Sequence, residues 1–331
     1  MVSSWNGSLA ARAGRPWAAA MLAGLVGLWA AAACGGSSQS PADLFPTVVT
    51  LGKGEVFPVV TNSALAVGEN RFSLGLVDRG ESPVLGATVH FRFFDLNGDR
   101  PLLRSEAQAR FVPAELFFID EGSGNEKTFV GENGVYVAQV NFDAPGRWGV
   151  QITVRLDGRE LAPMPFQFNV LERSREPAIG DPAPASRQLT LADVSDITEI
   201  DSSSPPRPRM HDITVADALT EGKPIVLAFA TPAFCESRTC GPVMDTVMDP
   251  LYEKYRDRAI FVHIEPYKLK ELRENIDQIP VQAVQEWDLQ TEPWVFVIGR
   301  QGRVAGKFEG IVAADEVESV LLRVLGEGGG P

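Results

Sequence analysis

The sequence predicts a multidomain chain in which an all-β sandwich is followed by an α/β domain. Three observations support this prediction. Short alternating segments bounded by turn residues fill the chain up to residue 171, a stretch rich in proline and serine follows, and continuous apolar runs alternate with helical patterns after residue 211. The length of 331 residues and a hydrophobic content of 44% are enough for two domains with cores of their own.

The N-terminus has the pattern of an export signal. Arg12 and Arg15 precede an uncharged apolar run that ends in small residues directly before Cys34. The sequence "AAAC", followed by a polar stretch, resembles the lipobox of bacterial lipoproteins, which implies cleavage before Cys34 and a lipid on that cysteine. We therefore expect a signal peptide over residues 1–33 and a chain anchored by its lipid to the extracytoplasmic side of the cell membrane. An uncleaved N-terminal membrane helix is the alternative.

The charge balance excludes nucleic acid as an expected partner. The chain has 43 acidic and 30 basic residues, with a net charge of -13, and no basic run that would follow a phosphate backbone. An acidic excess of this kind is typical of a well-solvated surface.

The first domain is predicted over residues 57–171, after a tether over residues 34–56. Its alternating segments are separated by turn sequences such as "LNGDRP" and "LDGRE", which predicts about seven strands and a sandwich. The clearest segments are "RFSLGLVD", "ATVHFRFFDL", "GVYVAQVNF", "GRWGVQITVRL" and "PFQFNVLE". The stretch "FDAPGRWGVQITV" resembles the immunoglobulin-like domains of bacterial exported proteins, including the YtkA-like group. That resemblance implies a spacer or a binding module.

The second domain is predicted over residues 211–326, after a linker over residues 172–210 that is rich in proline, serine and charge. Its pattern reads helix, strand, helix, strand, helices, hairpin and helix, which is an α/β layered order. The segments are "TVADALTEG", "KPIVLAFA", "GPVMDTVMDPLYEKYRD", "AIFVHIEPY", "KLKELRENIDQI" with "VQAVQEWD", "EPWVFVIGRQGRVAGKFEG" and "AADEVESVLLRVL".

This order resembles the thioredoxin-like proteins, and two local features strengthen the resemblance. The segment "IVLAFATPAFC" leads an apolar strand into Phe234 and Cys235, and "TEPWVFVIG" places Pro293 just before a later strand. The resemblance implies a cis proline that faces the cysteines, in a loop that receives an extended peptide. Phe234, Thr291, Glu292 and Pro293 would then form the substrate-binding surface.

The cysteine pair is the candidate redox centre. With Cys34 lipidated, Cys235 and Cys240 have only each other within the chain. Their C-x4-C spacing departs from the usual C-x2-C, so two assignments stay open: either cysteine attacks while the other resolves. A disulfide that closes so short a loop stabilises a fold by only about 2 kcal/mol, which favours a redox role over a structural one.

The position of the pair before a helix favours its reactivity. Unpaired N–H groups and the positive end of the helix dipole stabilise a thiolate, and Arg238 lies between the two cysteines, whereas Glu236 would oppose this effect. The sequence therefore predicts a thiol–disulfide oxidoreductase that acts on exported proteins and needs no cofactor. A non-catalytic binding module with the same fold is an alternative.

Copper binding is the second alternative. Sco-type copper proteins share the thioredoxin fold and use C-x3-C with a distant histidine, so Cys235, Cys240 and His263 are the candidate ligands for copper. Met244 and Met248 continue the helix face of Cys240, although core packing is the favoured interpretation of these methionines.

Overall fold

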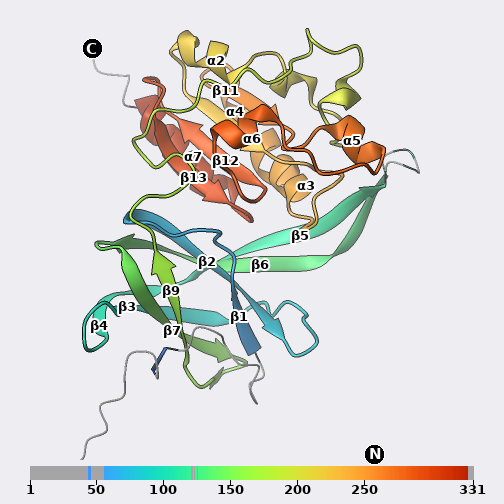
Figure 1. Ribbon diagram of the computed structural model, residues 1–331. Helices are drawn as coiled ribbons and strands as arrows, with labels where there is room; N and C mark the ends of the chain where they lie inside the picture. Colours follow the sequence, from blue (N-terminus) through green and yellow to red (C-terminus); the bar gives the residue numbers. More distant parts are fainter. Residues whose placement is uncertain (1–43, 46–55, 121, 123, 125, 327–331) are drawn as a thin grey trace, which may run out of the picture. The chain divides into compact units, whose positions relative to one another are not determined.

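Two antiparallel sheets form the first domain of the computed structural model, which describes residues 44–45, 56–120, 122, 124 and 126–326 (Figure 1). One sheet has the strand order β1-β2-β6-β5, and the other has the order β4-β3-β7-β8 with β9 also paired to β7. The strands are β1 (Val56–Val60), β2 (Gly68–Asp78), β3 (Thr88–Asp95), β4 (Leu102–Gln108), β5 (Arg110–Asp120), β6 (Glu126–Phe142), β7 (Gly146–Leu156), β8 (Arg159–Glu160) and β9 (Met164–Val170).

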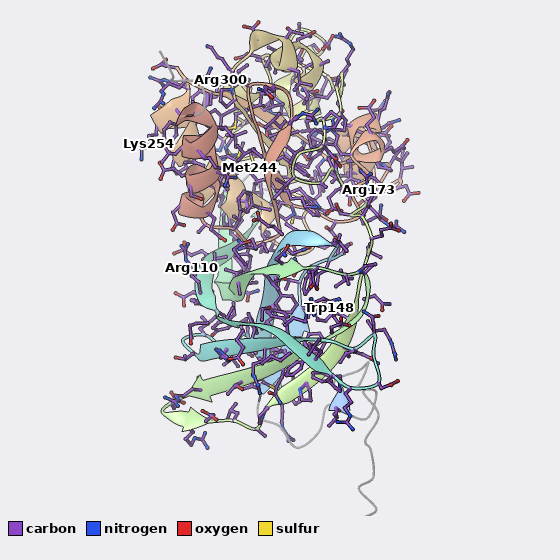
Figure 2. All side chains as sticks on the ribbon, turned by 90° about the vertical axis from the view of Figure 1, so that its left-hand side faces the viewer. Arg110, Trp148, Arg173, Met244, Lys254 and Arg300 are labelled. Carbon is purple, nitrogen blue, oxygen red and sulfur yellow. The ribbon has the colours of Figure 1, made fainter. Side chains whose placement is uncertain are left out.

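The core of this domain lies between the two sheets, as the alternating pattern predicts. In β3, Val89, Phe91 and Phe93 are fully buried, while the residues between them are more exposed. Trp148 of β7 is also fully buried and packs its ring against Phe142 of β6 at 4.8 Å between centroids (Figure 2). Both sheets contribute to this one aromatic cluster, so the domain is a sandwich.

Four strands of this domain lie outside the segments quoted above: β1, β4, β5 and β8. β4 and β5 carry mostly exposed or half-buried side chains, so their sequences lack the alternation that marks a half-buried strand. β5 pairs with β6 along its whole length, from Arg110 opposite Val137 to Asp120 opposite Glu126. The result is a long β5–β6 hairpin (Figure 1). Its outer part, in which Leu116–Asp120 pairs with Glu126–Gly131, is called the β5–β6 arm below.

The second domain has a four-stranded sheet in the order β11-β10-β12-β13. The strands are β10 (Ile225–Phe229), β11 (Ile260–Ile264), β12 (Trp294–Ile298) and β13 (Val304–Glu309). β10 runs parallel to β11 and antiparallel to β12, and β12 runs antiparallel to β13. This arrangement agrees with the thioredoxin-like domain that the sequence predicts.

Helices cover both faces of this sheet, which explains why β10 and β12 are continuous apolar runs. The helices are α2 (Val215–Ala218), α3 (Cys240–Val243), α4 (Asp249–Tyr255), α5 (Leu269–Arg273), α6 (Gln282–Glu286) and α7 (Ala314–Gly326). A π-helical turn, Met244–Met248, joins α3 to α4. Met244 and Met248 are fully buried in the core beneath this turn, in agreement with the packing interpretation.

The prediction of a linker over residues 172–210 needs correction, because the chain from Pro182 onward packs into the second domain. Pro182 forms an isolated β-bridge with Arg303, just before β13, Ser186 donates a hydrogen bond to Glu286 of α6, and Arg207 is only 4% exposed. Polar bonds, more than apolar contacts, hold this segment in place. Its composition therefore looks like that of a linker although its structure does not.

The remaining N-terminal predictions lie mostly outside the described residues. The signal peptide and Cys34 fall there, as does most of the tether. Within the tether, Phe45 is described, and it packs against Phe94 with 5.1 Å between ring centroids. Among the described residues, no helix is both long and apolar enough to cross a bilayer.

The two domains lie within one compact unit, residues 39–331, and make specific contacts with each other. Arg71 of β2 binds Glu316 of α7 through two hydrogen bonds of 2.8 and 3.0 Å, and both side chains are nearly buried. β5 contacts α3, which begins at Cys240. The first domain therefore reaches the helix that carries one of the candidate redox cysteines.

Candidate active site

The cysteine pair lies between the end of β10 and the start of α3. The loop between them contains two tight turns, in which Phe234 N–H donates to the Thr231 carbonyl and Arg238 N–H donates to the Cys235 carbonyl. Arg238 has a φ of 59°, a left-handed conformation that lets the chain turn back towards the helix. Cys240 is the first residue of α3.

The two cysteines are in direct contact. The Cys240 N–H donates to Cys235 Sγ at 3.3 Å, and the Ser237 hydroxyl lies 3.2 Å from the same sulfur. Both cysteines are free thiols in the structure. Cys235 is 8% exposed and Cys240 is fully buried, so Cys235 is the more accessible of the two.

The proline loop has the conformation that the resemblance implies. The Glu292–Pro293 bond is cis, and Pro293 directly precedes β12. The Thr291 hydroxyl donates to Glu309 at 2.6 Å and accepts from the Trp294 indole at 3.1 Å. The side chain of Thr291 is thus used to hold the loop, which leaves backbone groups as the part of the loop that could meet a peptide.

Glu292 and Phe234, two of the predicted surface residues, each contact a side chain of the second domain. The Tyr267 hydroxyl donates to the Glu292 carboxyl at 2.8 Å. Burial, and to a smaller extent the charge of Glu236, raise the pKa of Glu292, so Glu236 lies close enough to act on the proline loop. Phe234 packs its ring under the guanidinium of Arg273 at 5.8 Å.

The β5–β6 arm covers this loop. A Cβ placed on Gly241, next to Cys240, would fall 2.4 Å from the ring of Phe117, so the ring lies directly on the first turn of the helix. Lys127 of β6 packs over the Phe117 ring at 5.0 Å and pairs with Asp245 at 2.7 Å. Arg238 lies 5.9 Å from the ring of Phe118. This cover could not be predicted from the sequence, because no local pattern reports a contact between the two domains.

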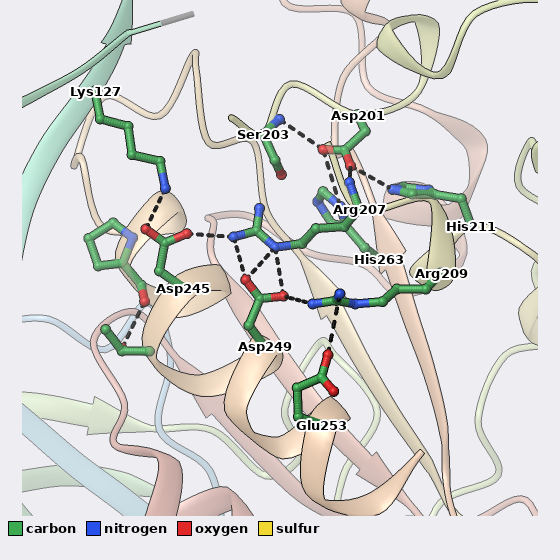
Figure 3. A network of polar contacts seen from close by, with 12 residues as sticks. Lys127, Asp201, Ser203, Arg207, Arg209, His211, Asp245, Asp249, Glu253 and His263 are labelled. Carbon is green, nitrogen blue, oxygen red and sulfur yellow. Dashed lines mark hydrogen bonds and ion pairs between the residues drawn. The ribbon is translucent and has the colours of Figure 1, made fainter. Parts of the chain in front are cut away.

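An ionic network centred on the buried Arg207 extends from this contact into the second domain (Figure 3). Arg207, in the predicted linker, donates three hydrogen bonds of 2.9 to 3.0 Å to Asp249 and one of 2.5 Å to Asp245. Asp249 also binds Arg209, which is 39% exposed. The network therefore fastens the segment before residue 211 to the helix that follows Cys240.

The network continues to a buried cluster of Asp201, His211 and His263. The backbone N–H groups of Ser203 and Arg207 donate to the Asp201 carboxylate at 2.8 and 2.5 Å. Although burial opposes its ionisation, the neighbouring imidazoles hold the pKa of Asp201 well below its ordinary value. Burial lowers the pKa of His263 to about 4, so this imidazole is neutral at pH 7.

The cluster is directly connected to the cysteine loop. His263 Nε2 lies 2.9 Å from the Ala230 carbonyl, and Ala233 N–H donates to the Ser202 hydroxyl at 3.1 Å. Glu265 accepts from the Ser202 N–H at 2.7 Å, and burial raises the pKa of this carboxyl to about 8. Only His211 and His263 were noticeable in the sequence, as two of three histidines. Asp201 was hidden in the predicted linker.

The structure does not assemble the predicted copper ligands. Among the described residues, the candidate ligand atoms that lie within 4.8 Å of one another belong to Asp201, His211 and His263, without either cysteine. The strand position of His263 directs its ring to Ala230 and Asp201 instead.

Comparisons with known proteins give a limited result. No family model matches the chain, and no curated protein matches it. Among solved structures, a protein described as the thiol:disulfide interchange protein DsbE from Chlorobium tepidum is 19% identical, covers 45% of this chain and 99% of its own, and has a TM-score of 0.32. A thioredoxin-like superfamily protein, SPOA0173, is 20% identical, covers 35% of this chain and 86% of its own, and has a TM-score of 0.24. Scores this low carry no argument about the site, whose geometry is interpreted on its own.

Proposed function

We propose that the chain is a membrane-anchored thiol–disulfide oxidoreductase that acts on exported proteins through Cys235 and Cys240. The observation that carries this proposal is the hydrogen bond from the Cys240 N–H to Cys235 Sγ at the start of a helix. A thiolate, not a thiol, attacks a disulfide, and a helix N–H that points at sulfur stabilises the thiolate. Of the two assignments that the sequence leaves open, this geometry favours Cys235 as the attacking residue.

In the reducing direction, the Cys235 thiolate attacks one sulfur of a partner disulfide. The partner S–S bond breaks, a mixed disulfide forms with Cys235, and the released partner thiolate takes up a proton. Cys240, once deprotonated, then attacks Cys235 Sγ, forms the Cys235–Cys240 bond and releases the second partner thiol. The partner gains two electrons and the pair loses two, and the reverse sequence oxidises a partner dithiol.

The peptide-binding surface is proposed at the rim of the cysteine loop, where Phe234 and the loop before Pro293 lie. Because the side chains of Thr291 and Glu292 are held by Glu309 and Tyr267, the backbone of this loop is the part offered to an extended peptide. Such binding depends on the extended backbone of the peptide more than on its side chains, which suits an enzyme with many exported proteins as substrates.

The first domain is proposed to be an immunoglobulin-like spacer that also covers the active site. Lipidation at Cys34 would hold both domains at the extracytoplasmic face of the cell membrane, an expectation that comes from the lipobox resemblance. Phe117 lies on the first turn of the helix at Gly241, so movement of the β5–β6 arm is proposed to widen access to the cysteine loop.

A non-catalytic binding module is the second candidate function. The observation that favours it is the low exposure of both cysteines, 8% for Cys235 and none for Cys240. A chain that only binds its partners would keep its cysteines covered permanently.

Trapping with oxidised glutathione separates the two functions. In Cys240→Ser, an exchange enzyme holds one glutathionyl group on Cys235, which mass spectrometry detects on the intact chain. In Cys235→Ser, the buried Cys240 should react far more slowly. If neither variant forms a mixed disulfide, while both remain folded by circular dichroism, the binding module is the better account.

A further inference from the structure

We propose that Asp201, His211 and His263 form a binding site for a divalent transition-metal ion, which Zn²⁺ fits best. These side chains come from two distant parts of the chain: Asp201 and His211 precede α2, and His263 lies on β11 (Figure 3). All three are at most 2% exposed, and their ligand atoms lie within 4.8 Å of one another. The site is separate from the cysteine pair and does not depend on thiol exchange.

Two of the ligand atoms have no hydrogen-bond partner. His263 faces the Ala230 carbonyl through Nε2 at 2.9 Å, and a carbonyl only accepts, so Nε2 carries the proton. Nδ1 of the same ring faces Asp201 from 3.8 Å and has no hydrogen-bond partner. His211 Nε2 lies 3.3 Å from Asp201, yet it has no hydrogen bond of acceptable geometry.

Such an arrangement is costly without a cation. Buried polar atoms without hydrogen-bond partners destabilise a fold, because they lose their bonds to water and gain none in return. A metal ion between the three groups would satisfy both nitrogen atoms and the carboxylate at once.

The spacing of the donors fits a tetrahedral ion. Zn–N and Zn–O bonds of about 2.0–2.1 Å place neighbouring tetrahedral ligands about 3.3–3.4 Å apart. His211 Nε2 lies 3.3 Å from Asp201 Oδ2, and His263 Nδ1 lies 3.8 Å from Asp201 Oδ1. The three ligand atoms lie within 4.8 Å of one another, so side-chain shifts would bring them to the spacing of a tetrahedral ion. Two imidazoles and one carboxylate are borderline donors of the type that zinc accepts.

The surroundings resemble those of a built metal site. Backbone N–H groups of Ser203 and Arg207 orient the carboxylate, and the Ala230 carbonyl orients the His263 ring, as outer-shell groups do around bound metals. A cavity of about 630 Å³ is lined by His211, His263 and Glu265. That cavity gives an entry path and room for water as a fourth ligand.

The test is metal binding by the full-length chain after treatment with a chelator. Titration with Zn²⁺ in a calorimeter should show one site per chain, and Zn²⁺ should raise the melting temperature. Asp201→Asn, His211→Gln and His263→Gln should each weaken binding at least about 100-fold, since the loss of an outer-shell partner alone costs 10–100-fold.

Two controls identify the ligands. His90→Gln changes a half-exposed histidine of the first domain and should leave binding unchanged. Cys235→Ser/Cys240→Ser should also bind Zn²⁺ as the unaltered chain does. Loss of binding in this double variant would assign the ion to the cysteines and overturn the proposal, as would full binding in His211→Gln and His263→Gln.

A measurement on the unaltered chain covers the case in which a variant fails to fold. Bound Co²⁺ should give the visible bands of a tetrahedral ion with nitrogen and oxygen ligands. The appearance of thiolate charge-transfer bands or of an octahedral spectrum would contradict the proposed site. So would a failure of Co²⁺ to bind stoichiometrically.

Discussion

The Cys240 backbone N–H points at Cys235 Sγ from 3.3 Å, so the sulfur of the first cysteine lies at the start of the helix that the second cysteine begins. With four residues between the cysteines, the turn at Arg238 brings the chain back so that the two residues are in contact. Cys235 is the more exposed of the two, and Cys240 is fully buried. The two cysteines are unequal, and this inequality has measurable consequences.

The first prediction concerns the reactivity of each cysteine. Cys235 in Cys240→Ser should be alkylated by iodoacetamide faster than Cys240 in Cys235→Ser, by roughly an order of magnitude or more, because it combines exposure with a stabilised thiolate. The rates are measured by mass spectrometry at pH 7. Equal rates, or a faster Cys240, would reverse the assignment of the attacking residue.

The second prediction concerns the cover over the site. Phe117→Ala removes the ring that lies on Gly241, so the arm should open more often. A loss of roughly 1 kcal/mol of contact corresponds to about a fivefold larger open population, and alkylation of Cys235 should accelerate by a similar factor.

Phe129→Ala is the matched control for this change. Phe129 is opposite Phe117 in the β5–β6 hairpin but is 58% exposed. Phe129→Ala should therefore leave the alkylation rate of Cys235 unchanged. An equal acceleration in both variants would mean that the hairpin itself was loosened, not that Phe117 acts as the cover.

The third prediction concerns the ionic network around Arg207. Arg207→Met removes charged hydrogen bonds to Asp249 and Asp245, which should lower the free energy of unfolding by about 1.5–3 kcal/mol, because both carboxylates are partly exposed, at 29% and 27%. Arg209→Met removes a more exposed partner of the same Asp249 and should cost at most about 1 kcal/mol. Urea unfolding of both variants measures the difference, and similar costs would show that burial of Arg207 has no special weight.

The fourth prediction concerns pH. Burial and the charge of Glu236 raise the pKa of Glu292 in the folded chain, so the folded state holds the proton more tightly than the unfolded state does. The stabilisation is present at low pH and is lost as pH rises from the ordinary carboxyl value through the raised one. Glu292→Gln should therefore gain stability relative to the unaltered chain as pH rises.

Glu292→Gln keeps an oxygen that accepts from Tyr267, so the hydrogen bond is retained while the charge is removed. Urea unfolding from about pH 4 to pH 7 gives the difference between the two chains. A constant difference across this range would show that Glu292 titrates equally in the folded and unfolded states.

The cysteine site was predictable because its signals are local. An apolar run before Cys235, a helical pattern after Cys240 and a proline before an apolar strand can all be read within a few residues of each other. The cis bond at Pro293 followed from the resemblance to thioredoxin-like proteins, and the structure confirms it.

The rest depends on contacts that no local pattern reports. Arg207 is buried by Asp245 and Asp249, about forty residues later, and Asp201 meets His263 across an even longer separation. The composition of residues 172–210 therefore predicted a linker, whereas part of this segment forms a buried polar cluster in the second domain. β5 was missed because few of its side chains are buried within its own domain, while Phe117 packs on the other one.

The most direct test of the central claim is the reduction potential of the Cys235–Cys240 pair in the full-length chain, titrated against defined thiol buffers and read by mass. Working oxidoreductases lie between about -120 and -270 mV, and the proposed exchange activity predicts a value in that range. A value below about -300 mV would mark a resistant structural disulfide and contradict the account.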